Sequence, residues 1–173
     1  MSERPPMKGP HCPQCGTPFV RLIHHQGRLE PLLKWFRLYP FRCQVCANRF
    51  VALRRGIKDD SQAFDRREYK RLSTNFPVVF AANQLSLDEV VIDLSMGGCS
   101  VRTAQPLARG TFVELLLKPS TREPGIKVET AIVCCVRPST VGVKFLELEP
   151  QEKTRLSRVV HSLLLSQTAA PQA

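Results

Sequence analysis

Four cysteines near the start of the chain form two Cys-x-x-Cys pairs, Cys12 with Cys15 and Cys43 with Cys46. This spacing lets both thiolates of a tight turn face one ion, and two such turns complete the tetrahedral shell of Zn²⁺. Such a closed shell has no position left for substrate, so the pattern predicts a structural zinc ion. Three histidines are further candidate ligands, although four cysteines already fill the shell: His11, His24 and His25.

The segment around these cysteines, residues 11–53, is expected to form a zinc-ribbon-like module. About forty residues bury too little surface to be stable alone and usually need a metal, disulfides or a partner. The 27 residues between Cys15 and Cys43 leave room for an inserted element. Apolar residues recur there at helical spacing and predict a short helix: Leu29, Leu32, Leu33 and Phe36. We expect this 29–37 stripe to pack as a miniature core, the alternative being a basic helix that docks on a membrane or a protein groove.

A second group of residues that could bind a ligand is basic. Arg66, Arg67, Lys70 and Arg71 place four cations within six residues, and Arg67 and Arg71 have the spacing R-x-x-x-R. A run of charge is often a solvated surface or a linker. A guanidinium group can also bind phosphate oxygens, or O6 and N7 of guanine, through paired hydrogen bonds. The run alone does not decide between these interpretations.

Asp93, Ser95 and Gly98 form the pattern D-x-S-x-x-G within the sequence VVIDLSMGGCSVRT. In a strand, Asp93 and Ser95 point to the same face, beside a turn whose glycines allow close approach of the backbone. The pattern fits either a binding surface or a hairpin whose polar side chains satisfy local backbone groups.

The elements that carry these residues differ from the first fifty residues. Residues 54–64 are polar and are expected to be a linker. The region that follows, 65–168, shows short strands with period two and then a helix, typical of a small antiparallel barrel or sandwich. The strands are predicted at about 77–82, 87–94, 99–103, 111–118, 126–136 and 141–146. An apolar stripe predicts the C-terminal amphipathic helix: Leu156, Val159, Val160, Leu163 and Leu164.

Together, the two motifs resemble those of the PilZ domain, the bacterial receptor module for cyclic di-GMP. The resemblance runs from about Asp65 to Leu148 and includes the segments RLSTNFPVVF, DLSMGG, GTFVELLL and VGVKFLEL. It implies a mainly β fold, a six-stranded antiparallel barrel, with the arginine segment folded over the dinucleotide. It also implies which residues bind cyclic di-GMP: Arg66, Arg67, Arg71, Asp93, Ser95 and Gly98.

Composition narrows the classes of function. The net charge of +10 favours an anionic partner, and residues 1–60 carry 11 Lys and Arg against 4 Asp and Glu. The chain lacks a Cys-His or Ser-His pair at catalytic spacing and a glycine-rich phosphate loop, so no enzyme is expected. Seven cysteines without a secretory signal or a transmembrane segment indicate reduced thiols and a cytoplasmic protein.

The leading hypothesis is therefore a cytoplasmic cyclic di-GMP receptor or adaptor that switches an unknown protein target when ligand binds. The alternative is a zinc-ribbon protein that binds nucleic acid, with the barrel as a regulatory or vestigial module. Contact with a membrane through the 29–37 stripe is a further hypothesis.

The resemblance also generates a prediction on stoichiometry. Within the family, an arginine directly ahead of the first motif is associated with two intercalated cyclic di-GMP molecules, and Arg66 holds this place. Its guanidinium would offset repulsion among the phosphates and could stack on a guanine. We expect calorimetric titration to give two ligands per chain, and one in Arg66→Leu with a moderate loss of first-site affinity. Saturation of the unaltered chain at one ligand would refute this.

Overall fold

The computed structural model describes five ranges of the chain: 9–24, 35–53, 67–82, 85–105 and 107–169. The chain divides into two compact units, Met1–Tyr69 and Lys70–Ala173. All seven cysteines lie in the described ranges, and all are free thiols. None of the helices in these ranges combines the length and apolar character needed to cross a membrane.

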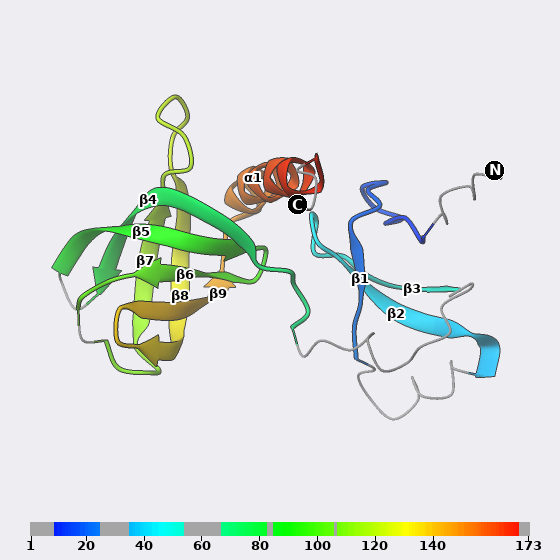
Figure 1. The fold of residues 1–173 in the computed structure, drawn as a ribbon, viewed down its shortest axis with the longest axis horizontal. Helices are drawn as coiled ribbons and strands as arrows, with labels where there is room; N and C mark the ends of the chain where they lie inside the picture. Colours follow the sequence, from blue (N-terminus) through cyan, green and yellow to red (C-terminus); the bar gives the residue numbers. More distant parts are fainter. Residues whose placement is uncertain (1–8, 25–34, 54–66, 83–84, 106, 170–173) are drawn as a thin grey trace. The chain divides into compact units, whose positions relative to one another are not determined.

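The first unit contains a small antiparallel sheet (Figure 1). Its strands are β1 (Val20–Leu22), β2 (Leu38–Cys43) and β3 (Arg49–Leu53), in the order β1-β2-β3. The few buried apolar side chains include Ile23 and Phe41, and the ring of Phe41 stacks on that of Phe50 at 5.9 Å. Two of the paired cysteines, Cys12 and Cys43, are also buried. Thiols therefore make up part of the unit's small interior.

The predicted helical stripe ahead of β2 lies mainly outside the described residues, which do not include Leu29, Leu32 and Leu33. Its last member, Phe36, is described and is 71% exposed, and its neighbour Trp35 is 89% exposed. Arg37 then takes a left-handed φ of 56°, which turns the chain into β2. Phe36 therefore does not pack into a miniature core as predicted, and the prediction for the other three residues of the stripe lies outside the described residues.

The second unit contains a closed barrel of six antiparallel strands, which confirms the predicted fold class. The strands are β4 (Leu72–Ala82), β5 (Leu85–Ser95), β6 (Gly98–Arg102), β7 (Phe112–Leu117), β8 (Ile126–Arg137) and β9 (Thr140–Glu147). Their order around the barrel is β4-β5-β6-β9-β8-β7 (Figure 1).

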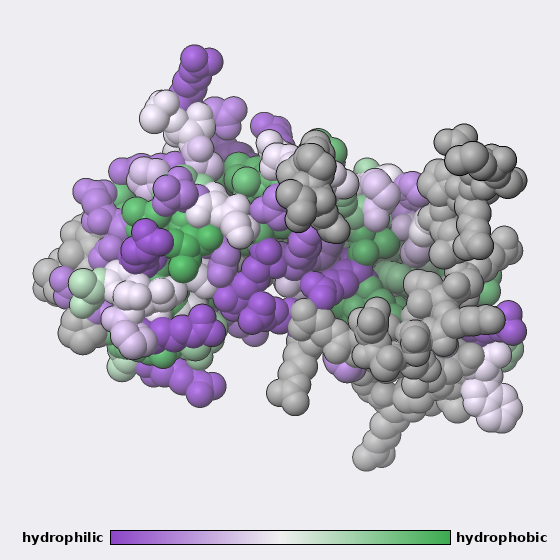
Figure 2. Space-filling model, in the orientation of Figure 1, coloured by the Kyte–Doolittle hydropathy of each residue, from purple (hydrophilic) through white to green (hydrophobic). Residues whose placement is uncertain are grey.

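Period-two alternation explains why these residues close into a barrel. In β7, Val113, Leu115 and Leu117 are buried while Glu114 is exposed, because successive side chains of a strand point to opposite faces. Every strand supplies buried apolar residues to the interior, among them Val78, Phe80, Val91, Leu94, Val101, Leu115, Val128 and Val141. Figure 2 shows hydrophilic residues over much of the barrel's visible outer surface, with apolar ones between them.

The first barrel strand begins earlier than predicted. β4 starts at Leu72 rather than near Pro77, and its pairing with β5 shifts between Ser73 and Phe76. A β-bulge of this kind adds residues that have no partner and breaks the alternation from which strands are recognised. The polar sequence Ser73-Thr74-Asn75 therefore conceals a strand.

The C-terminal helix α1 (Pro150–Ala169) packs on the barrel through one face. Leu156, Val160 and Leu164 are its buried residues, spaced four apart as helical periodicity requires. A carboxylate oxygen of Glu152 accepts a hydrogen bond from the backbone N–H of Lys127 at 3.0 Å, which ties the first turn to β8. The predicted amphipathic helix is confirmed.

The packing of α1 gives a prediction for stability. Leu156 is fully buried, so Leu156→Ala leaves a cavity and should lower the free energy of unfolding by about 2–5 kcal/mol. Leu165, on the same helix and 52% exposed, is the matched control, and its replacement by alanine should change stability by no more than about 0.5 kcal/mol. Urea denaturation measures both, and equal losses would contradict the packing described.

Candidate functional site

The four predicted zinc ligands come together in the first unit. The sulfurs of Cys12, Cys15, Cys43 and Cys46 all lie within 4.8 Å of one another. Cys12 is 3.5 Å from Cys46 and Cys15 is 3.5 Å from Cys43, sulfur to sulfur. Zinc–sulfur bonds of about 2.3 Å in a tetrahedron place sulfurs roughly 3.8 Å apart. The donor set and its geometry therefore fit a tetrahedral metal ion.

Each Cys-x-x-Cys pair forms the same kind of turn, which we call a knuckle. In the first, 12–17, the N–H of Cys12 donates to the carbonyl of Thr17 at 3.0 Å. In the second, 43–48, the N–H of Cys43 donates to the carbonyl of Asn48 at 2.8 Å. The residue after each pair has a left-handed φ, 71° at Gly16 and 63° at Ala47. The second knuckle thus imposes on alanine a conformation that glycine adopts without cost.

Electrostatics within the cluster oppose joint ionisation of the thiols. Burial disfavours the Cys12 thiolate, but hydrogen bonds from the backbone of Cys15 and Gln14 and from neighbouring thiols lower its pKa to about 7. Burial raises the pKa of Cys43, and burial with the surrounding thiols raises the pKa of Cys46. Four thiolates this close need a cation to offset their charge, and a divalent metal supplies one.

Two residues at the start of the second knuckle, Arg42 and Gln44, also contact Glu68 and Tyr69. One guanidinium nitrogen of Arg42 (Nη2) lies 2.7 Å from a carboxylate oxygen of Glu68. The side-chain amide of Gln44 donates to the backbone carbonyl of Glu68 at 3.0 Å. The guanidinium of Arg42 also lies over the ring of Tyr69, 5.6 Å from its centroid, and burial raises the pKa of Tyr69.

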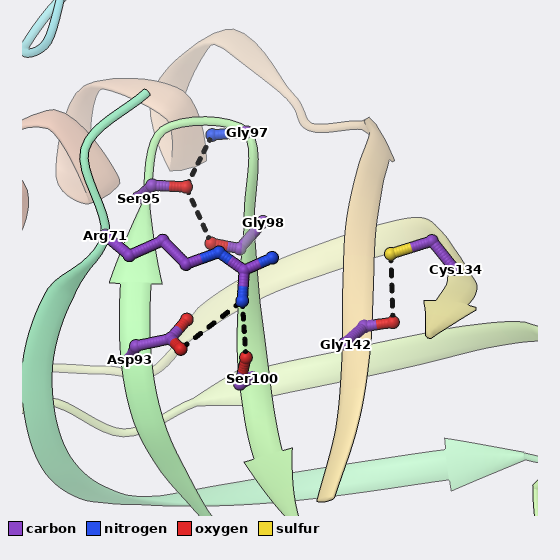
Figure 3. Close-up of polar contacts among 8 residues, drawn as sticks. All are labelled: Arg71, Asp93, Ser95, Gly97, Gly98, Ser100, Cys134 and Gly142. Carbon is purple, nitrogen blue, oxygen red and sulfur yellow. Dashed lines mark hydrogen bonds and ion pairs between the residues drawn. The ribbon is translucent and has the colours of Figure 1, made fainter. Parts of the chain in front are cut away.

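In the second unit, Arg71 lies just ahead of β4 and reaches the β5–β6 hairpin (Figure 3). Its Nη1 donates to the hydroxyl of Ser100 at 3.0 Å and lies 3.4 Å from Oδ2 of Asp93. Asp93 and Ser100 are directly opposite each other in the register of the two strands. The hairpin thus presents a carboxylate and a hydroxyl to one guanidinium.

The two-residue turn of this hairpin is fixed by Ser95. Its hydroxyl donates to the carbonyl of Gly98 at 3.0 Å and accepts from the N–H of Gly97 at 3.4 Å (Figure 3). A Cβ on Gly98 would collide with the backbone carbonyl of Val143 on β9. Ser95 and Gly98 therefore shape the hairpin that carries Asp93.

Asp93 keeps one unused acceptor. Its Oδ1 is buried and has no hydrogen-bond partner among the described residues. A buried acceptor without a donor costs free energy, so such atoms in native structures need an explanation. The side chain as a whole is 24% exposed and that of Arg71 is 35% exposed, so solvent and solutes reach both.

The family follows from comparison with known proteins. The sequence model of the PilZ domain matches residues 65–162, more than half of the 173-residue chain. The chain belongs to the PilZ domain family. Among curated proteins, no sequence matches this chain.

Solved structures with similar folds agree with this assignment. The PilZ domain of Escherichia coli YcgR with c-di-GMP has 21% identity and a TM-score of 0.50, covering 60% of this chain and 95% of that one. The Bacillus subtilis inhibitor of motility, MotI/DgrA, has 17% identity and a TM-score of 0.53, covering 69% of this chain and 68% of that one. These likenesses support the PilZ fold.

The predicted ligand-binding residues fall into three groups in this PilZ protein. Arg71, Asp93 and the hairpin residues Ser95 and Gly98 come together in the barrel unit. Arg67 belongs to the first unit, and Arg66 lies outside the described residues. The roles of Arg66 and Arg67 stay predictions.

Ser100 is the site residue that sequence reasoning missed. It is almost fully buried, and the hairpin register places it opposite Asp93. Its hydroxyl therefore lies where it can accept a hydrogen bond from Arg71. The signal was present in the sequence, because a two-residue turn at Met96-Gly97 pairs Ser95 with Gly98 and hence Asp93 with Ser100.

A groove of about 410 Å³ lies elsewhere on the PilZ unit, between the β4 bulge, the β7–β8 loop and α1. Its lining includes Asn75, Phe76, Pro119, Glu123, Arg158 and Val159. Neither Arg71 nor Asp93 lines it, so this groove is separate from the site built on the hairpin.

Proposed function

We propose that this PilZ protein is a receptor for cyclic di-GMP and that Arg71, Asp93 and the Ser95–Gly98 hairpin form part of its ligand site. The observation that carries the proposal is the position of Arg71. In a PilZ domain, it places a guanidinium beside a carboxylate that retains a buried, unused acceptor. The related PilZ domain of YcgR is described with c-di-GMP, which supports the same ligand here.

The chemistry of the ligand matches these groups. Cyclic di-GMP carries phosphates, to which Arg71 can donate, and guanines whose O6 and N7 accept paired hydrogen bonds from a guanidinium. The N1–H and N2 amine of guanine are donors, and Oδ1 of Asp93 is an acceptor in need of one. Arginine and aspartate can thus form hydrogen bonds with opposite edges of a guanine. Arg66 and Arg67 would supply further cations from the segment ahead of the barrel.

We also propose that the first unit binds one structural zinc ion through Cys12, Cys15, Cys43 and Cys46. Zinc supplies the positive charge that lets these crowded thiols ionise together. We assign residues 11–53 to this ribbon, 54–64 to a linker, and 65–168 to the PilZ barrel and its helix. The protein would act in the cytoplasm as a binding protein rather than an enzyme, passing ligand binding on to a downstream target.

Calorimetry with cyclic di-GMP tests the receptor function. Arg71→Ala should weaken binding by about 1.5–3 kcal/mol, the range for hydrogen bonds to charged groups, while circular dichroism shows an intact fold. Asp93→Ala should weaken it as well, because the base loses its acceptor.

Arg122, an exposed arginine of the β7–β8 loop, provides the matched control. Arg122→Ala removes the same charge from the barrel and should leave the affinity unchanged. Absence of binding to the unaltered protein, or unaltered affinity in Arg71→Ala, would refute the assignment of this site.

The metal proposal is tested by composition and chelation. Purified protein should contain one zinc per chain, and a strong chelator should unfold the ribbon while the barrel stays folded, since structural zinc contributes on the order of 10 kcal/mol to small domains. Cys15→Ser should lose zinc, whereas Cys135→Ser, an exposed cysteine outside the cluster, should retain it. Reduced protein free of metal by elemental analysis would refute the proposal.

A further inference from the structure

Glu68 and Tyr69, which lie between the two motif arginines in the sequence, are bound to the second knuckle. Both residues belong to the same compact unit as the four clustered cysteines. Neither carries a recognised ligand-binding role in the R-x-x-x-R pattern, where only Arg67 and Arg71 are specified. Their contacts therefore need an explanation of their own.

The link between the knuckle and Glu68 runs through one guanidinium. Nη1 of Arg42 donates to the carbonyl of Ala47 at 3.1 Å, directly after Cys46. Nη2 of the same group contacts the Glu68 carboxylate at 2.7 Å, and the Arg42 side chain is only 18% exposed. Charge-assisted hydrogen bonds this short are among the stronger polar contacts in proteins. The conformation of the knuckle and the position of Glu68 are thus tied to the same group.

The backbone and the next side chain are held as well. Gln44, buried and adjacent to Cys43, donates to the carbonyl of Glu68, so the contact fixes main chain as well as side chain. The ring of Tyr69 lies under the Arg42 guanidinium in a cation–π contact. Three contacts, two of them made by Arg42, therefore order these two consecutive residues.

The residues that make these contacts are close in sequence to the arginines of the proposed ligand site. Arg67 directly precedes Glu68, and a single residue, Lys70, separates Tyr69 from Arg71. Arg71 is in turn held by Asp93 and Ser100 on the barrel. Glu68 and Tyr69 are therefore held within the first unit, and Arg71 is held within the second.

We propose that Glu68 and Tyr69 are positioning residues through which zinc occupancy of the ribbon raises the affinity of the PilZ site for cyclic di-GMP. The inference rests on the proposed ligand and the proposed metal. In small metal-binding modules the binding of metal is coupled to folding, so zinc would stabilise the surface to which Glu68 and Tyr69 bind. A segment that is already ordered loses less conformational entropy when ligand binds, which increases affinity.

The test uses the full-length, zinc-loaded protein and the double variant Glu68→Ala with Tyr69→Leu. Neither residue is a zinc ligand, so the variant should keep its metal. Calorimetry should show binding of cyclic di-GMP that is weaker by about thirtyfold or more, the scale expected when the backbone of two ordered residues is released. Asp88→Ala is the matched control, because it removes a carboxylate from a 4.0 Å ion pair with Lys118 on the barrel and should leave affinity unchanged.

Reciprocity gives a second readout that needs no substitution. Coupling between two binding sites is equal in both directions. Saturating cyclic di-GMP should therefore raise the affinity for zinc by the same factor by which zinc raises the affinity for cyclic di-GMP. Competition with a chelator measures the zinc affinity. In the double variant, ligand should have no effect on zinc affinity. A merely structural role of Glu68 and Tyr69 would not produce this loss of linkage.

Three outcomes would overturn the inference. The double variant could bind cyclic di-GMP with the affinity of the unaltered protein, or the zinc affinity of the unaltered protein could be the same with and without cyclic di-GMP. The third is a rate of amide exchange in residues 67–71 that is unchanged when zinc is removed. The exchange measurement requires no ligand, so it separates this inference from the proposed function. If the unaltered protein fails to bind cyclic di-GMP, the receptor proposal fails, and with it the coupling. Exchange would then still decide whether the ribbon holds the segment.

Discussion

The register of the β5–β6 hairpin is the constraint on which the barrel site depends. Gly98 leaves no room for a side chain against the carbonyl of Val143, so β6 pairs with β9 at close range. The two-residue turn then places Asp93 opposite Ser100, within reach of one guanidinium. A slip of one residue would move Asp93 to the other face of its strand. The position of the candidate ligand site therefore follows from the hairpin register and from the close pairing of β6 with β9.

The two units are stabilised by different physics. The barrel buries apolar residues from all six strands and from α1, so its stability comes from the hydrophobic effect. Among its described residues, the first unit buries few apolar side chains, including Ile23 and Phe41, and places two cysteines in the same interior. Crowded thiols are unfavourable as charges and useful as ligands, so the zinc ion that we propose would stabilise this small unit.

Features with a local periodic signal could be predicted from the sequence. The barrel strands, α1 and the four clustered cysteines were recognised from alternation, helical spacing and Cys-x-x-Cys pairs. Features set by tertiary contacts were not recognised. The start of β4 is hidden by a bulge at polar residues, and Ser100 gains its role from cross-strand register. Phe36 has the helical spacing of a buried residue but is 71% exposed. Glu68 binds Arg42 across 26 positions of sequence, a separation at which no local pattern carries information.

Arg42 and Arg71 make the same kind of contact, but the two contacts differ in length. Each guanidinium joins a carboxylate to a neutral acceptor: Glu68 and the carbonyl of Ala47 for Arg42, Asp93 and the Ser100 hydroxyl for Arg71. The distance from guanidinium nitrogen to carboxylate oxygen is 2.7 Å at Arg42 and 3.4 Å at Arg71. The shorter contact suits a permanent link. The longer contact at Arg71 is weaker, so under the proposed function Arg71 can exchange Asp93 for a phosphate or a base at little cost.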